Sequence, residues 1–133
     1  MPADRTDPQT EGRTVTHGQL TIRFRRDRHH LLVELAGELD LAASDALRAE
    51  LDAAADHDAG LTVVDLGQLR FVDSSGLGVL FDAAQRADAE DRRIVYTNPS
   101  EEVERTLHLT GLDHVLPFDA PAAGLPEPEA RRP

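Results

Sequence analysis

Two stretches near the start of the chain alternate between apolar and polar positions. In residues 20–25 the apolar side chains fall at every second position, and residues 31–35 repeat this pattern across Glu34. Alternation with a period of two is typical of strands buried on one face. Residues 27–29, which are charged or polar, separate the two stretches. The pattern therefore predicts two half-buried strands joined in a β-hairpin.

The next pattern is helical. After Asp40 the apolar residues Leu47, Leu51 and Ala54 fall on one face of a helix, and the pattern stops before Gly60. Glycine readily takes the left-handed conformation that ends many helices. We therefore expect an amphipathic helix from Asp40 to just before Gly60.

A second helical pattern begins in the seventies. Leu77, Leu80, Phe81 and Ala84 recur at intervals of three and four residues, so one face of this segment is apolar and is expected to lie on a sheet. The run at 61–66 before it is apolar and β-branched, as in a strand covered on both faces.

A third helix is expected after another short apolar run at 94–96. Asn98 is in position to cap it, with Pro99 at the first helical position and Glu101 at the third, and Gly111 is expected to end it. Residues 112–118 are then expected to return to the sheet, where Pro117 favours an edge strand, or to pack beneath it.

These elements follow the order ββαβαβα, with a final short strand. Strands that alternate with helices favour an α/β fold, and we expect a mixed, mainly parallel sheet of four to five strands with its helices packed on one side. Six of the eight prolines lie in residues 1–17 or 119–133, which are otherwise polar and alanine-rich. The interpretation is one folded domain over residues 18–118 between two disordered tails.

Charge and composition exclude several functions. The chain has 14 basic and 25 acidic residues, a net charge of −11, and all its basic residues are arginines. Such a chain repels nucleic acid and anionic membranes, so we expect neither as a direct partner. With no cysteine it has no disulfide or zinc–thiolate site. Because neither a long apolar run nor a signal-peptide pattern is present, we expect a cytoplasmic protein.

The candidate chemistry centres on Ser74. It follows Asp73 and precedes Ser75 and Gly76, at the point where the buried strand is expected to pass into the second helix. A serine there serves as an N-cap, and a helix start also favours a bound anion such as a phosphate. Glycine at 76 and 78 lowers helix propensity, which suggests that another surface approaches the backbone closely.

Enzymatic and metal-binding functions are not favoured. Ser74 has neither the Gly-x-Ser-x-Gly elbow nor a recognisable histidine base, and the chain has no lysine for Walker A or Ser-x-x-Lys chemistry. The six histidines show no ligand spacing; His108 and His114 straddle a helix end, and we expect them to be solvent-exposed. We therefore expect no catalytic residue, no metal and no cofactor.

Three motifs together resemble a known family. Residues 73–79 (DSSGLGV), preceded by 37–40 (GELD) and followed by 110–112 (TGL), are similar to the STAS-domain anti-sigma-factor antagonists of bacteria, in the same order and spacing over residues 18–118. The resemblance implies the STAS fold. It also implies that Ser74 is phosphorylated by a partner that is both anti-sigma factor and serine kinase, whereas Ser75 matches a position that is not usually the acceptor.

The resemblance further implies a partner switch. The unmodified protein would bind the anti-sigma factor and release sigma, phosphorylation would weaken the complex, and a serine phosphatase would reset it. Glu38 and Asp40 lie in the loop that in this family flanks the serine, although from sequence alone Asp40 is equally a helix cap and Glu38 a solvated side chain. The alternative function is a non-catalytic STAS subunit of a lipid-transport ATPase or a stress-signalling scaffold. The expected partner-binding residues are Glu38, Asp40, Asp73, Ser74, Ser75, Gly76 and Leu77.

Overall fold

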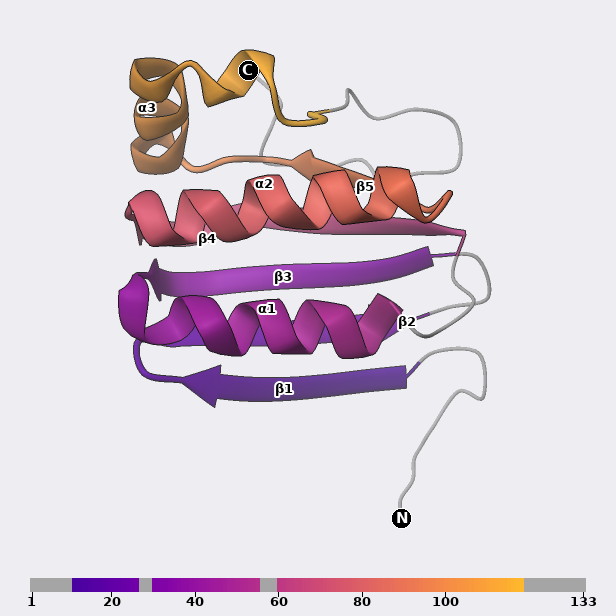
Figure 1. Ribbon diagram of the computed structural model, residues 1–133. Helices are drawn as coiled ribbons and strands as arrows, with labels where there is room; N and C mark the ends of the chain where they lie inside the picture. The colour runs from indigo at the N-terminus through magenta and orange to yellow at the C-terminus, as the bar shows by residue number, and fades with distance from the viewer. Residues whose placement is uncertain (1–10, 27–29, 56–59, 119–133) are drawn as a thin grey trace.

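The computed structural model describes residues 11–26, 30–55 and 60–118, which form a five-stranded sheet and three α-helices (Figure 1). In chain order the elements are β1 (Glu11–His17), β2 (Leu20–Arg26), β3 (His30–Leu39), α1 (Leu41–Ala55), β4 (Leu61–Val72), α2 (Ser74–Ala89), β5 (Arg93–Thr97), α3 (Glu101–Thr110) and a short 3₁₀ helix, η1 (Leu112–His114).

The strands lie in the sheet in the order in which they occur in the chain. The β1–β2 and β2–β3 ladders are antiparallel, whereas β3–β4 and β4–β5 are parallel. Helices α1 and α2 lie side by side across one face, and α3 stands at the β5 end (Figure 1). Inner residues of all three helices belong to one hydrophobic core. The expected α/β fold with a mixed sheet is confirmed, with five strands.

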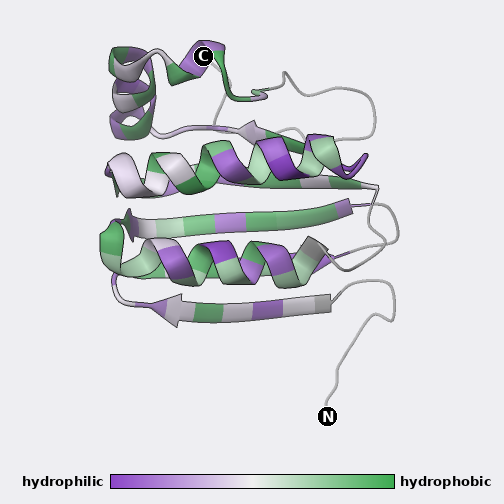
Figure 2. Cartoon of the chain, viewed as in Figure 1, coloured by the Kyte–Doolittle hydropathy of each residue, from purple (hydrophilic) through white to green (hydrophobic). Residues whose placement is uncertain are grey.

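The core begins in the β2–β3 hairpin. Ile22 lies directly opposite Leu35 across the antiparallel ladder, and both are completely buried. In Figure 2, β3 is hydrophobic along most of its length, whereas β1 has a single hydrophobic segment. The alternation in the sequence therefore identified the buried face of this hairpin, while residues 27–29 lie outside the described part of the chain.

Strand β1 corrects the expected domain boundary. Residues 11–17, which the sequence places in the expected N-terminal tail, pair with β2 along its whole length. Val15 is the strand's one large apolar residue, so the sequence pattern there is weak. The guanidinium of Arg13 lies 4.6 Å from the ring centroid of Phe24 and 2.9 Å from Oε1 of Glu50 on α1. These contacts join β1 to the domain, while the rest of the expected tails, 1–10 and 119–133, lies outside the described residues.

Strand β4 is longer than the run that predicted it. It extends from Leu61 to Val72, beyond the apolar run at 61–66 and up to the expected passage into the second helix. The register against β3 shifts twice along its second half, and as a result Leu66 and Leu69, three residues apart, are both completely buried. Such irregularities interrupt the period-two pattern, so the sequence concealed the strand's second half.

The start of α3 is also corrected. Ser100, and not Asn98, is the N-cap: its Oγ accepts a hydrogen bond from the amide of Val103 at 3.2 Å. Asn98 instead takes a positive φ of 56° and donates from its side chain to Asp65 at 3.3 Å. The expected end of the helix is confirmed, because Gly111 is a left-handed C-cap with φ 79°.

The expected final strand is reduced to one bridge. After η1, Phe118 forms an isolated parallel bridge with Tyr96 of β5, and the Tyr96 amide donates to the Pro117 carbonyl at 3.0 Å. The outer side of β5 is thus partly covered by the chain itself.

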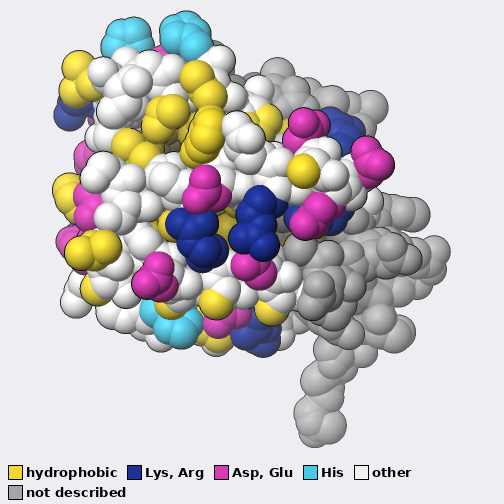
Figure 3. All heavy atoms as spheres, in the orientation of Figure 1, with side chains coloured by type: hydrophobic (Ala, Val, Ile, Leu, Met, Phe, Trp, Pro, Cys, Tyr) yellow, Lys and Arg dark blue, Asp and Glu magenta, His cyan; other side chains and the backbone are white. Residues whose placement is uncertain are grey.

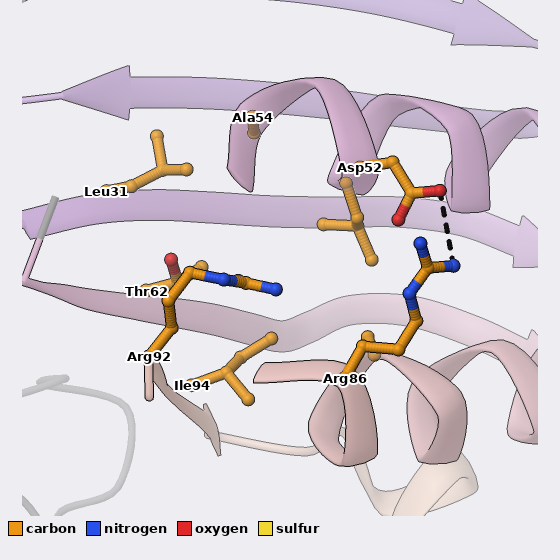
Figure 4. Close-up of a pocket in the computed structure, with 9 residues that line it drawn as sticks. Leu31, Asp52, Ala54, Thr62, Arg86, Arg92 and Ile94 are labelled. Atoms are coloured by element: carbon orange, nitrogen blue, oxygen red, sulfur yellow. Dashed lines mark ion pairs between the residues drawn. The ribbon is translucent and has the colours of Figure 1, made fainter. Parts of the chain in front are cut away.

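Helices α1 and α2 are linked by two ion pairs. Arg48 of α1 lies 2.7 Å from Asp82 of α2, and Arg86 of α2 lies 3.3 Å from Asp52 of α1. Figure 3 shows basic and acidic side chains interleaved on this face, and Figure 4 shows the Arg86–Asp52 pair. All four side chains are partly exposed. Among the described helices, none is long and apolar enough to span a membrane.

Candidate functional site

Asp73 joins the starts of two helices. It is the N-cap of α2, and its Oδ1 accepts a hydrogen bond from the amide of Gly76 at 3.0 Å. Its Oδ2 accepts a second bond, also 3.0 Å, from the amide of Leu41 at the start of α1. Its own amide donates to the carbonyl of Leu39 at 3.1 Å. This one carboxylate therefore satisfies backbone donors that each helix start would otherwise leave unpaired.

Asp40 caps α1, as the sequence allowed. Its Oδ1 accepts from the amide of Ala43 at 3.1 Å, and its carbonyl accepts from the amide of Ser44 at 3.0 Å. Because β3 and β4 are parallel neighbours, their carboxyl ends meet at the same edge of the sheet. The two capping carboxylates, Asp40 and Asp73, are thereby brought to that edge.

Ser74 is the first residue of α2 and is exposed, whereas Ser75 is half-buried. The sequence placed a serine at or next to the N-cap, and the structure puts Ser74 directly after the capping Asp73. The Ser74 hydroxyl is not needed to cap the helix, because Asp73 does so. It is therefore available to a reagent or partner that approaches from solvent.

Gly76 and Leu77, expected to contact a partner, are both buried inside the protein. A Cβ on Gly76 would lie 2.6 Å from Cγ of Leu39 and 2.8 Å from its carbonyl oxygen. The close approach inferred from this glycine is therefore made by β3 of the same chain. Gly78 differs, since a Cβ there would meet nothing within 4 Å.

Glu38 borders this edge from the end of β3. Its amide donates to the carbonyl of Gln19 at 2.9 Å, and its carboxylate lies 3.9 Å from the guanidinium of Arg70 on β4. Both side chains are well exposed, at 39% for Glu38 and 69% for Arg70. The long, exposed ion pair holds Glu38 weakly, which leaves its carboxylate accessible.

Two apolar residues of the site were not identified from the sequence. Leu41 is 72% exposed and Phe71 is 48% exposed, although both belong to regular elements. Leu41 bonds to Asp73 through its amide, and Phe71 pairs with Glu38 across the β3–β4 ladder. The exposure of Leu41 could have been inferred from the sequence, because this leucine is the first residue of the helix and precedes the first inward-facing one. The exposure of Phe71 could not, because it depends on the register shift in β4. We call the surface formed by Glu38, Asp40, Leu41, Phe71, Asp73 and Ser74 the Ser74 face.

A cavity of about 30 Å³ lies away from this face, near the carboxyl ends of α1 and α2 (Figure 4). Its lining includes Asp52, Arg86 and Arg92, but its volume suits only water molecules. No group of three or more His, Asp or Glu residues in the described ranges is placed to hold a metal ion. His108 and His114 are exposed, at 75% and 82%, as expected from the sequence.

Comparisons with known proteins agree with this architecture. Residues 22–117 match the protein family described as "Mlab, STAS domain". The anti-sigma F factor antagonist of Paenibacillus polymyxa is 32% identical over 100 residues, which cover 74% of this chain and 86% of that protein.

Two solved structures share the fold. Unphosphorylated SpoIIAA, an anti-sigma factor antagonist, superimposes with a TM-score of 0.55 at 23% identity, covering 77% of this chain and 82% of that one. The phosphorylated form of the Bacillus cell fate determinant SpoIIAA gives 0.53 at 22% identity, covering 78% and 86%.

Proposed function

The chain belongs to the STAS domain family, and from this premise we propose that it is an anti-sigma factor antagonist whose binding is switched off by phosphorylation of Ser74. In the unmodified state it binds an anti-sigma factor that is also a serine kinase. This binding releases a sigma factor, so transcription is activated without contact between this protein and DNA. We place the switch in the cytoplasm, where sigma factors act.

The observation that carries the proposal is the exposed hydroxyl of Ser74 at the start of α2, directly after Asp73. Because Asp73 caps the helix, the Ser74 hydroxyl is not needed for capping. A kinase can therefore modify it without unfolding the helix. The exposed side chains of Leu41, whose amide bonds to Asp73, and of Phe71, three residues before Ser74 in the chain, add apolar area at this end of the sheet. Exposed apolar side chains surrounded by polar groups are typical of protein-binding surfaces.

Phosphorylation would change the charge of the Ser74 face. A phosphoserine adds about −1.5 to −2 charges at neutral pH. Asp73 already holds the amide of Gly76, so part of the donor capacity that a helix start offers to an anion is in use. The phosphate would thus stand beside a carboxylate, and a docked partner would have to desolvate it. Both effects weaken the complex.

The SpoIIAA structures support this switch by analogy, since that anti-sigma factor antagonist is described in an unphosphorylated and a phosphorylated form. Glu38 and Asp40, whose carboxylates belong to the Ser74 face, are the groups we expect to pair with arginines of the partner. A separate phosphatase would restore the binding state.

The test is phosphorylation by the cognate anti-sigma kinase with labelled ATP, followed by a binding measurement. We expect Ser74→Ala to stay folded, to take up no label and to keep its affinity, and Ser74→Asp to bind weakly. Ser75→Ala is the matched control, one residue away, and should still be labelled. Normal labelling of Ser74→Ala would show that Ser74 is not the acceptor.

Recovery of partners from the native cell decides between functions. An anti-sigma kinase of the small, histidine-kinase-like ATPase type supports the antagonist. If the bound protein is instead a transporter ATPase, and neither the parent nor the variants are phosphorylated, the role of a non-catalytic transporter subunit replaces it.

A further inference from the structure

The two edges of the sheet differ. The outer side of β5 is approached by the chain's own residues Pro117 and Phe118. At the other end β1 pairs with β2, and no strand of the described residues pairs with its opposite side. Within the described residues, the outward amides and carbonyls of this seven-residue strand therefore form an unpaired hydrogen-bonding edge.

Proteins usually protect such an edge with proline, lysine or an unpaired charge, and β1 has none of these in residues 12–17. Thr14 and Thr16 are exposed and uncharged. The two basic residues of this stretch are neutralised within the chain: Arg13 lies 2.9 Å and His17 3.2 Å from the carboxylate of Glu50. Although the protein is strongly acidic, residues 12–17 of this edge carry little net charge.

We propose that β1 is a self-association surface, which pairs antiparallel with β1 of a second copy to form one continuous mixed sheet of ten strands. A two-fold axis through Thr14, the midpoint of the strand, pairs all seven residues of each copy. Thr14 then lies opposite Thr14 of the second copy, and Arg13 opposite Val15. A shift of the axis to Val15 would place Arg13 opposite His17, two basic groups, and would leave residues unpaired.

The dimer keeps the Ser74 face available. Strands β2 and β3 separate β1 from β4, which carries Phe71 and leads into Ser74. Association is opposed by repulsion between two chains of net charge −11, so added salt should strengthen it by screening. An interface based on charge attraction would respond in the opposite direction.

The first test is sedimentation equilibrium of the full chain at about 10 µM to 1 mM, a range suited to weak association. We expect the average mass to rise from monomer toward dimer with concentration, and to rise further at high salt. A mass that stays monomeric throughout this range overturns the proposal.

Single cysteines test the register, because the natural chain has no cysteine. Paired residues of antiparallel strands have Cα atoms about 4.5–5.5 Å apart, which suits a disulfide. Under a mild oxidant such as diamide, Thr14→Cys should cross-link rapidly between copies. Thr16→Cys is the matched control: it is equally exposed and on the same face, but in this register the two copies of residue 16 are roughly 13 Å apart. Equal cross-linking of the two variants overturns the proposed pairing, because it indicates random collision.

Discussion

The carboxylate of Asp73 accepts a hydrogen bond at 3.0 Å from the backbone amide of Leu41, 32 residues earlier in the chain. Since the same carboxylate also caps α2, the starts of the two helices are tied together through one side chain. Ser74 and the exposed Leu41 side chain are thus held in a fixed relation to each other. Any partner that contacts one of them will meet the other in a constant geometry.

Removal of this carboxylate should destabilise the fold more than removal of an ordinary cap. We expect Asp73→Ala to cost about 1–3 kcal/mol, because two backbone donors lose their acceptor, and Asp40→Ala to cost about 1 kcal/mol. Urea unfolding of both variants measures the difference. An Asp73→Ala protein with the parent's unfolding midpoint would show that these bonds add no net stability.

The two glycines at the start of α2 should respond in opposite ways to alanine. Gly76→Ala places a methyl group 2.8 Å from the carbonyl oxygen of Leu39, so we expect a loss of about 1–3 kcal/mol. Gly78→Ala meets open space in a helix and should be neutral or stabilise by up to about 1 kcal/mol. Thermal unfolding of the two variants measures whether each change raises or lowers stability. A Gly76→Ala variant as stable as the parent would contradict the packing described.

Leu41 should contribute to partner binding and not to folding. Leu41→Ala removes apolar area that is 72% exposed, so its unfolding free energy should change by less than about 0.5 kcal/mol. Its affinity for the anti-sigma kinase should fall by about tenfold, as for a moderate interface anchor. Leu109→Ala is the matched control, since Leu109 is 77% exposed but lies on α3. Equal losses of affinity in the two variants would exclude a specific role for Leu41.

Truncation of Leu80 should lower the free energy of unfolding as much as truncation of any residue in the core. Leu80 is completely buried on the inner face of α2, and Leu80→Ala should cost about 2–5 kcal/mol through lost burial and a residual cavity. Phe81, only partly buried beside the core, should cost less when changed to alanine. Chemical denaturation ranks the two, and the reverse order would mean that α2 presents a different face to the sheet.

Acid should loosen β1 before the rest of the sheet. Burial opposes ionisation of Glu50, but hydrogen bonds from Arg13 and His17, with their positive charges, outweigh this effect and lower its pKa below the usual 4.5. A lowered folded-state pKa gives stability that is present above pH 4.5 and is lost as the pH falls through the folded value. Hydrogen exchange of the β1 amides should accelerate in that range. Glu50→Gln should exchange faster already at neutral pH and respond less to acid, and an unchanged acid response in this variant would exclude Glu50 as the cause.

Much of the fold was predictable because its core elements follow simple periodicities. Ile22, Leu35, Leu47 and Leu80 all lie where the sequence patterns placed them, in the buried core. The position of Ser74 at the start of α2 was likewise predictable from its neighbours. These features depend on the spacing of residues that are near one another in the chain, and this spacing can be read from the sequence.

The errors have a common physical origin in contacts between distant residues. Strand β1 is held by Arg13 contacts to Phe24 and Glu50, which its own sequence does not reveal. The second half of β4 is set by register shifts against β3. Gly76 packs closely against Leu39, a contact that its neighbours in the sequence do not reveal.

The ion pairs between α1 and α2 restrict how the two helices align along their axes. Arg48 precedes Asp52 on α1, whereas on α2 Asp82 precedes Arg86, so the charge order is reversed between the helices. Sliding one helix past the other by a single turn would set two arginines or two aspartates side by side. Partly exposed pairs of this kind add only about 0–1 kcal/mol each to stability, yet both favour the same offset between the two helices. Ion pairs in the middle of the helices thus favour the same alignment of Leu41 and Ser74 that the bond from the Leu41 amide to Asp73 supports at the helix starts.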